Sequence, residues 1–152
     1  SELTRMAEEA PAGGPQIDPN DARLVAPVSM PDALAELCRE ANLPAPTTPG
    51  ATIRCALESL AASYRVVLER LEKLAGRSLE AIHVVGGGVQ NELLCQMTAD
   101  ACKRPVLAGP IEATALGNVM MQALADGQVS DVAQAREAIS ASFEPKRYDP
   151  RQ

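Results

Sequence analysis

The chain has 152 residues, 46% of them hydrophobic and 2% aromatic, with a formal net charge of -6 and a pI near 4.8, so one aliphatic core in a single domain is the default. The acidic charge and the scarcity of aromatic side chains exclude the basic field and the stacking platforms of nucleic-acid-binding proteins. Because no apolar run approaches the roughly 20 residues that span a bilayer, and no signal pattern opens the chain, we expect a soluble cytoplasmic protein without membrane partners.

Residues 1–28 are rich in proline, glycine and aspartate and contain few apolar side chains, which is typical of extended chain. One turn of helix over Leu3–Ala10 is the regular structure that we expect there. We interpret 1–28 as an extended N-terminal segment that lies against another part of the protein. Since the chain opens at Ser1 without a methionine, we expect it to be a piece of a longer chain.

Two amphipathic helices follow this segment. Ser29 stands at the N-cap position of a helix predicted over about Pro31–Ala41. Thr48 and Pro49 supply the cap and the first-turn proline of the longest helix, which ends at Gly76. Apolar residues recur along it at steps of three and four, and charged residues fill the other face. We expect those charges to form a solvated surface with modest ion pairs.

The middle of the chain predicts a strand, a helix and a second strand. Leu79–Val85 is apolar and β-branched, which indicates a central strand covered on both faces. After three glycines, a helix opens at Gln90 or Asn91. Pro105–Ala108 then forms a short strand, which Pro105 places at an edge or at a strand beginning. This succession is a βαβ unit with parallel strands, so the fold class is α/β, rich in helices and with a short parallel sheet.

Two more helices complete the predicted domain. One runs from about Glu112 to Asp126, and its middle is unusually small, with Gly117 among alanines. Small side chains permit close approach of another backbone, so we expect this helix to pack on the glycine turn or on the crossover helix. A last helix covers about Asp131–Ser142. The folded domain therefore spans 29–144, and 145–152 is a polar tail.

The metal-binding and nucleophilic residue types are few and widely spaced. No C-x-x-C pair is present, so we expect no metal site. We interpret the cysteines as buried thiols; a disulfide between Cys38 and Cys55 is the alternative, because these two lie near the facing ends of two predicted helices. His83 is interpreted as a partly buried strand residue, with a general base as the alternative. The four cysteines are Cys38, Cys55, Cys95 and Cys102.

The glycine turn is the one stretch that suggests a ligand. Gly86, Gly87 and Gly88 remove every Cβ between the strand and the helix, so the backbone can take positive φ and a flat ligand can approach the main chain. The dinucleotide fingerprint G-x-G-x-x-G fails, because Asn91 stands where its third glycine belongs. A G-x-x-x-x-G-K-[ST] phosphate loop is also missing from the sequence. A purely structural turn remains the alternative.

Several motifs at matching separations resemble the C-terminal region of the FGGY carbohydrate kinases. The resemblance extends from Ile17 to Pro150 and is far more specific than the glycine turn alone. The segments that carry it are Ile17–Pro19, Met30–Pro31, Gly86–Gln96, Ala99–Ala101, Arg104–Val106, Ala108–Thr114 and Glu112–Asn118.

The resemblance implies a ribonuclease H-like fold of the actin-type ATPase kind and transfer of the ATP γ-phosphate to a sugar hydroxyl, with magnesium. By position, Gly87 would contact the adenosine end of ATP through its backbone, flanked by Gly86 and Gly88. Asn91 would hydrogen-bond adenine or ribose, and Gln90 is the weaker candidate.

In the family, the catalytic aspartate, the sugar-binding residues and the phosphate-binding hairpin precede the region that this chain resembles. We therefore assign no catalytic and no metal-binding residue here, and we expect the fragment alone to be inactive without its N-terminal kinase domain. A non-catalytic α/β scaffold or oligomerisation module is the alternative. Self-association through apolar surface left bare by the missing domain is also left open.

Overall fold

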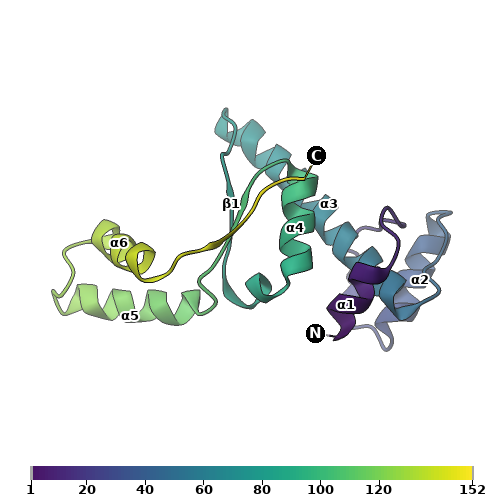
Figure 1. Cartoon of the computed structure of the whole chain (residues 1–152), viewed down its shortest axis with the longest axis horizontal. Helices are drawn as coiled ribbons and strands as arrows, with labels where there is room; N and C mark the ends of the chain where they lie inside the picture. The colour runs from purple at the N-terminus through teal and green to yellow at the C-terminus, as the bar shows by residue number, and fades with distance from the viewer. Residues whose placement is uncertain (1, 152) are drawn as a thin grey trace.

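The computed structural model describes residues 2–151, which form a helical N-terminal part, a small sheet beside helices, and a helical hairpin that lies apart (Figure 1). The α-helices are α1 (Glu2–Glu9), α2 (Met30–Glu40), α3 (Pro49–Ala75), α4 (Glu92–Cys102), α5 (Ala113–Ala125) and α6 (Val132–Ser142). The strands are β1 (Ile82–Val84), β2 (Val106–Ala108) and β3 (Lys146–Tyr148). Short 3₁₀ helices are η1 (Ala22–Leu24) and η2 (Gly86–Gln90).

Local capping explains where the first long helices begin and end, and it confirms the predictions made for them. The Ser29 hydroxyl accepts a hydrogen bond from the Asp32 amide at 3.4 Å, and the Thr48 hydroxyl accepts one from the Ala51 amide at 3.2 Å. Gly76 ends α3 in the left-handed conformation, with φ of 64°. Among the described residues, no helix is long and apolar enough to cross a membrane.

Helix α3 joins the N-terminal part to the sheet, because α1 packs on its first half and α4 on its middle. Arg104 fixes its far end. The Arg104 guanidinium donates to the Leu79 carbonyl at 2.7 Å and to the Glu72 carboxylate at 3.0 Å. The Leu79 amide donates to the same carboxylate at 2.8 Å, and this bond above all lowers the pKa of Glu72. The strand entry is therefore held in place by one ion pair and its hydrogen bonds.

The sheet differs from the prediction in order and direction. Strands β1 and β2 pair in parallel, with Ile82 opposite Val106, as the βαβ prediction requires. Strand β3 then pairs antiparallel with β2, with Tyr148 opposite Val106, so the sheet is mixed and β2 is its central strand. The expectation of a central strand at Leu79–Val85 was wrong, because Pro105 precedes the β2 ladder and leaves both edges of β2 able to pair.

The C-terminal residues that were expected to form only a polar tail contain this third strand. Lys146 and Arg147 are exposed and Tyr148 is buried, so the strand buries a single side chain and shows little of the apolar pattern that identifies strands. Tyr148 packs in the core beneath α4, together with Val106, Ala108, Cys95 and Ala99. A second cluster of Ala7, Leu57, Ala61 and Met97 holds α1, α3 and α4 together.

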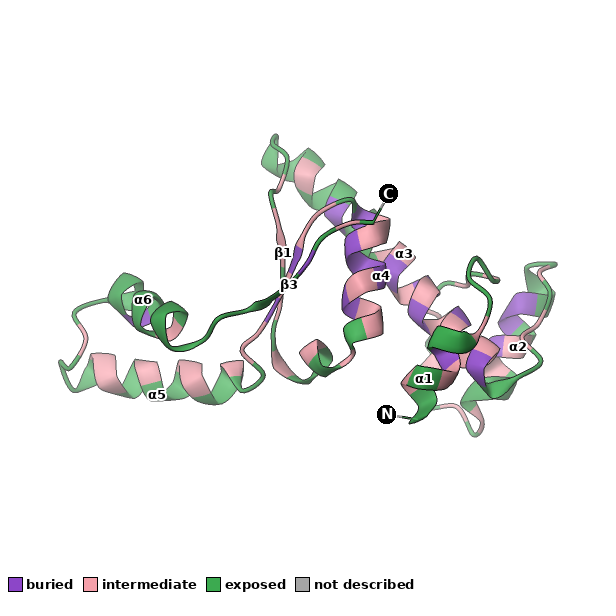
Figure 2. Ribbon diagram, viewed as in Figure 1, coloured by how far each residue is buried: buried purple, intermediate pink, exposed green. Residues whose placement is uncertain are grey.

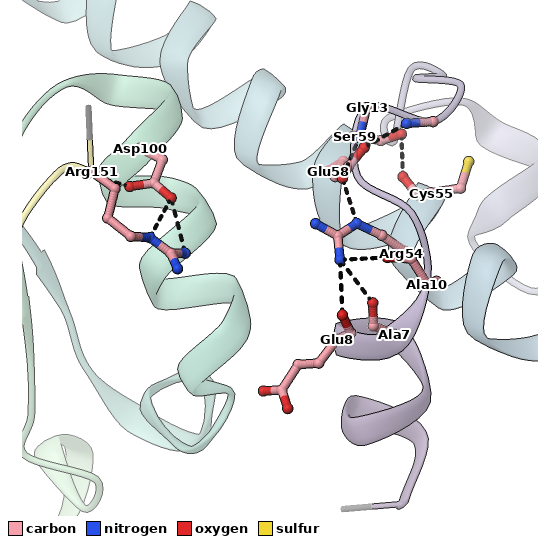
Figure 3. A network of polar contacts seen from close by, with 11 residues as sticks. Ala7, Glu8, Ala10, Gly13, Arg54, Cys55, Glu58, Ser59, Asp100 and Arg151 are labelled. Atoms are coloured by element: carbon pink, nitrogen blue, oxygen red, sulfur yellow. Dashed lines mark hydrogen bonds and ion pairs between the residues drawn. The ribbon is translucent and has the colours of Figure 1, made fainter.

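The N-terminal segment is more regular than extended chain. Helix α1 has 8 residues and packs on α3, with Ala7 fully buried. Arg54 in α3 receives the end of α1: its Nη1 donates to the carbonyls of Ala7 and Ala10 at 3.0 and 2.9 Å, and its Nε donates to Glu58 at 2.7 Å (Figure 3). The turn of helix predicted over Leu3–Ala10 is confirmed, one residue earlier at each end, and its packing partners lie in α3. The division into 1–28, 29–144 and 145–152 stays a prediction.

The four cysteines are buried and free, which confirms the interpretation as thiols; the alternative Cys38–Cys55 disulfide is not formed. Cys38 of α2 and Cys55 of α3 contact each other where the helices meet. Burial raises the pKa of Cys55 to about 12, and the neighbouring Cys38 thiol adds to that shift.

The alanine-rich helix α5 was expected to pack on the glycine turn or on α4. That expectation was wrong. Among the described elements its main contact is α6, and none of its residues is buried (Figure 2). Nothing lies within 4 Å of a Cβ built at Gly117. Gly117 therefore serves no close packing contact within the described chain, and Val119 and Met121 on the same helix are more than half exposed.

Candidate functional site

The glycine turn lies where the parallel strands β1 and β2 end, and the two loops are joined there. The Gly109 amide donates to the Val84 carbonyl at 2.9 Å, and the Gly86 amide donates to the Pro110 carbonyl at 3.1 Å. The Gly109–Pro110 peptide bond is cis. In α/β sheets, ligands bind at the carboxyl ends of parallel strands, so this edge is the place where the topology favours a site.

The structure separates the roles of the three glycines. Gly86 has φ of +76°, which requires glycine for conformational reasons. Gly87 has no such φ, and nothing lies within 4 Å of a Cβ built on it. Gly88 likewise lacks a positive φ, and its Cβ would meet only the Val84 side chain at an ordinary 3.7 Å. Gly87 and Gly88 are exposed, so the fold itself does not explain two of the three glycines.

Asn91 and Gln90 occupy different positions. The helix after the turn begins where predicted, since Asn91 is the N-cap of α4 and its side-chain oxygen accepts from the Leu94 amide at 3.1 Å. That bond uses the oxygen of Asn91, so its amide nitrogen is the group left to donate to a ligand. Gln90 is exposed and lies on the rim of a cavity.

That cavity has a volume of about 780 Å³ and lies between the glycine turn, the start of α5 and the C-terminal segment. Its walls are mainly apolar. Acidic side chains outnumber basic ones around it, and Lys146 pairs with Glu92 at 2.7 Å, a bond that raises the pKa of Lys146. The lining residues are Val89, Gln90, Glu92, Ala108, Gly109, Pro110, Ile111, Glu112, Leu116, Ser142, Phe143, Glu144, Lys146 and Tyr148.

Sequence reasoning missed the half of this cavity that comes from the C-terminal segment. Phe143, directly after α6, and Lys146 and Tyr148 of β3 line the cavity, in a region predicted to be helix end and tail. Lys146 and Tyr148 are two residues apart and so share one face of a strand, which was the available signal. Three residues are too few, however, to identify a strand.

Metal-ligating side chains do not form a cluster within the described residues. No group of three or more histidine, cysteine, aspartate or glutamate side chains lies close enough there to hold an ion. His83 is exposed on β1 rather than partly buried, and it lines a separate cavity of about 390 Å³ between β1, α3 and α4.

Comparison with known proteins places this chain in a family. The family model for the FGGY family of carbohydrate kinases, C-terminal domain, matches residues 1–125. Rhamnulokinase of Bacteroides thetaiotaomicron is 48% identical over 134 residues, which cover 88% of this chain and 28% of that protein. Rhamnulokinase of Enterococcus faecalis is 44% identical over 150 residues, which cover 97% of this chain and 30% of that protein.

A solved structure supports the same fold. The crystal structure of xylulose kinase from Rhodospirillum rubrum matches with a TM-score of 0.63 and 21% identity, over 99% of this chain and 29% of that one. The helix-rich arrangement with a short mixed sheet is thus that of the ribonuclease H-like C-terminal domain of such kinases. The chain spans less than a third of the length of these relatives. It belongs to the FGGY family of carbohydrate kinases, as a C-terminal region of such an enzyme.

Proposed function

We propose that this chain is the nucleotide-binding C-terminal part of an ATP-dependent sugar kinase, and that the substrate of the whole enzyme is L-rhamnulose. In the proposed reaction a hydroxyl oxygen of the ketose attacks the γ-phosphorus of ATP, the bond to the β,γ-bridging oxygen breaks, and L-rhamnulose 1-phosphate, ADP and a proton are formed. The two rhamnulokinases that match nearly all of this chain support the choice of sugar. The cytoplasm, which supplies ATP, is the proposed compartment.

The observation that carries the proposal is the exposed backbone at Gly87 and Gly88. Neither residue needs to be glycine for its φ or for packing, yet both lie at the carboxyl end of β1 beside the loop that follows β2. An open, side-chain-free backbone at that edge suits a flat ligand that contacts main-chain atoms. We assign the contact with the adenosine end of ATP to Gly87, with Gly86 and Gly88 on either side.

The neighbouring side chains favour the base and ribose over the phosphates. Glu92, Glu112 and Glu144 surround the adjoining cavity, with Lys146 already paired to Glu92. Carboxylates repel a polyphosphate, whereas uncharged adenine and ribose meet no such barrier. Asn91 is proposed to donate a hydrogen bond from its side-chain amide nitrogen, and Gln90 is proposed as a secondary partner from the rim.

The chain is proposed to be inactive by itself. Phosphoryl transfer needs a residue that orients the attacking hydroxyl and groups that neutralise the phosphates. The described residues hold no cluster that would bind magnesium, so we assign the metal no ligand in this chain. The matching relatives are more than three times longer, which leaves room for a catalytic domain elsewhere in the enzyme. Sugar phosphorylation by the purified chain would contradict this assignment.

A scaffold or oligomerisation module is the second candidate function. Helix α5 exposes Val119 and Met121 and buries no residue, so it offers apolar surface for a partner. Under this alternative the chain would self-associate through α5 and would not respond to nucleotide. Sedimentation of Val119→Asp and wild-type chains would detect such an interface.

Heteronuclear NMR with added MgATP tests the proposed function. We expect amide shifts confined to residues 86–91, and loss of these shifts in Gly87→Ala. Gly14→Ala is a matched control, because Gly14 also has an unstrained φ and open space around a built Cβ. Because the rest of the nucleotide pocket lies outside this chain, the titration is repeated with the whole enzyme. Absence of shifts at 86–91 in both would contradict the proposal.

A further inference from the structure

Three polar side chains on α4 all bind the C-terminal segment. Glu92, Gln96 and Asp100 follow each other at steps of four, so they form one stripe along the helix. Each binds a different part of residues 143–151, which we call the C-terminal strap. Glu92 pairs with Lys146 Nζ at 2.7 Å, Gln96 Nε2 donates to the Asp149 carbonyl at 2.9 Å, and Asp100 binds Arg151.

Asp100 makes the densest of these contacts (Figure 3). Its carboxylate accepts the Arg151 amide at 2.7 Å and the Arg151 Nε at 3.2 Å. Gln96 also donates to Asp100, at 2.9 Å, so two members of the stripe support each other. These contacts join positions 51 residues apart in the sequence, and they fix where the strap ends on the helix.

Apart from the short backbone pairing of β3 with β2, the strap is attached to the rest of the chain mainly by exposed side chains. Its residues are exposed apart from Tyr148 and, in part, Pro150. The ion pairs that hold it are solvated, with Lys146 and Glu92 both more than half exposed. Tyr148 is the one buried anchor, and its hydroxyl is buried without a hydrogen-bond partner among the described residues. Segments with these properties open locally while the rest of a protein stays folded.

Opening of the strap would change the cavity beside the glycine turn. Phe143, Glu144, Lys146 and Tyr148 line one side of this cavity of about 780 Å³, and Gln90 lines another. Because all four residues belong to the strap, its release removes that side as a unit.

We propose that the C-terminal strap is a detachable wall of this cavity, and that the stripe of Glu92, Gln96 and Asp100 on α4 sets how often it opens. Asp100 is a positioning residue in this device, since it contacts the strap and not the cavity. The inference rests on contacts within the chain and does not depend on which ligand the glycine turn binds.

Hydrogen exchange of the full chain, followed by mass spectrometry, tests the device. In Asp100→Asn we expect amides of residues 145–151 to exchange about three- to tenfold faster, because the charge-assisted bonds to Arg151 are weakened. Amides of α3 and α4 should keep their wild-type rates. Asp131→Asn is the matched control: it removes the same charge, and asparagine still caps α6. Equal strap exchange in Asp100→Asn and wild type would overturn the proposal, as would equal acceleration throughout the chain.

Tyr148→Phe should change the exchange rate of the strap in the opposite direction to Asp100→Asn. Phenylalanine keeps the buried ring and removes the unpartnered hydroxyl, so the closed strap should be favoured and residues 145–151 should exchange more slowly than in wild type. Faster exchange in this variant would show that the Tyr148 hydroxyl holds the strap. That result would contradict the proposal, in which the buried ring and the polar stripe on α4 hold it.

Discussion

Gly50 in the first turn of α3 lies directly against Met6 of α1, where a Cβ built on Gly50 would overlap the backbone carbonyl oxygen of Met6. Because that oxygen belongs to the backbone, it cannot move aside as the end of a flexible side chain could. The docking of α1 therefore depends on the missing side chain of Gly50 as well as on the contacts that Arg54 makes with the α1 carbonyls.

Gly50→Ala should separate α1 from α3. Overlap with backbone forces a shift that lowers the free energy of unfolding by about 1–3 kcal/mol, although alanine in a helix gains up to about 1 kcal/mol in propensity. Gly117→Ala in α5 is the control, because its Cβ meets open space and only the propensity gain of about 1 kcal/mol remains. Urea unfolding followed by circular dichroism measures both. Equal stabilisation of the two variants would show that α1 does not dock as described.

The glycine turn predicts different effects for adjacent substitutions. Gly86→Ala should lower the free energy of unfolding by about 1–2 kcal/mol, because φ of +76° is strained for alanine. Gly87→Ala should leave stability within about 0.5 kcal/mol of wild type, since its surroundings are open. Urea unfolding of the two variants in parallel checks this order. A large loss in Gly87→Ala would give Gly87 a structural role and weaken the case for a ligand.

Local signals in the sequence predicted most helices but not their partners. Ser29, Thr48 and Asn91 cap helices through side chains that accept from the amide three residues ahead, so the pattern is visible without the fold. Helix α1 and strand β3 depend on distant elements, α3 and β2 respectively. Strand β3 buries a single side chain and shows no clear period, so it was predicted as tail, whereas α1 was predicted as one turn of helix without its partner.

The candidate site was predicted in the same uneven way. The position of the turn and of the helix after it followed from Gly86 and Asn91, whose roles are local. Two features could be learned only from the coordinates. Of the three glycines in the turn, only Gly86 has a positive φ, and Gln90 lines a cavity. In the sequence, the helices α4, α5 and α6 separate the β3 residues that complete this cavity from the turn, so no spacing rule connects them.

The cysteines should resist modification in the native chain. Burial raises the pKa of Cys55, Cys95 and Cys102, which keeps these thiols protonated and out of reach of reagents at pH 8. Reaction with Ellman's reagent should therefore be slow in buffer and complete in denaturant, with four thiols per chain. Fewer than four thiols in denaturant would reveal a disulfide, and fast reaction in buffer would contradict the burial.

Acid should weaken the junction between α3 and β1. The pKa of Glu72 is lowered in the folded state, first by the Leu79 amide and then by Ser78 and Arg104. A lowered folded pKa stabilises the fold above the ordinary value of 4.5, and that contribution is lost as the pH falls through the folded value. Glu72→Gln should flatten the fall of unfolding free energy in this acidic range, measured by urea unfolding at several pH values. An unchanged slope would contradict the role given to Glu72.

Steady-state kinetics of the whole enzyme with Gly87→Ala test the nucleotide site most directly. An added methyl group on the proposed adenosine contact should raise the KM for ATP about tenfold or more, by a loss of about 1.4 kcal/mol in binding, while the KM for the sugar stays within a factor of two or so. Gly14→Ala should change neither constant. An unchanged KM for ATP in a stable Gly87→Ala enzyme would contradict the assignment of the glycine turn to the nucleotide.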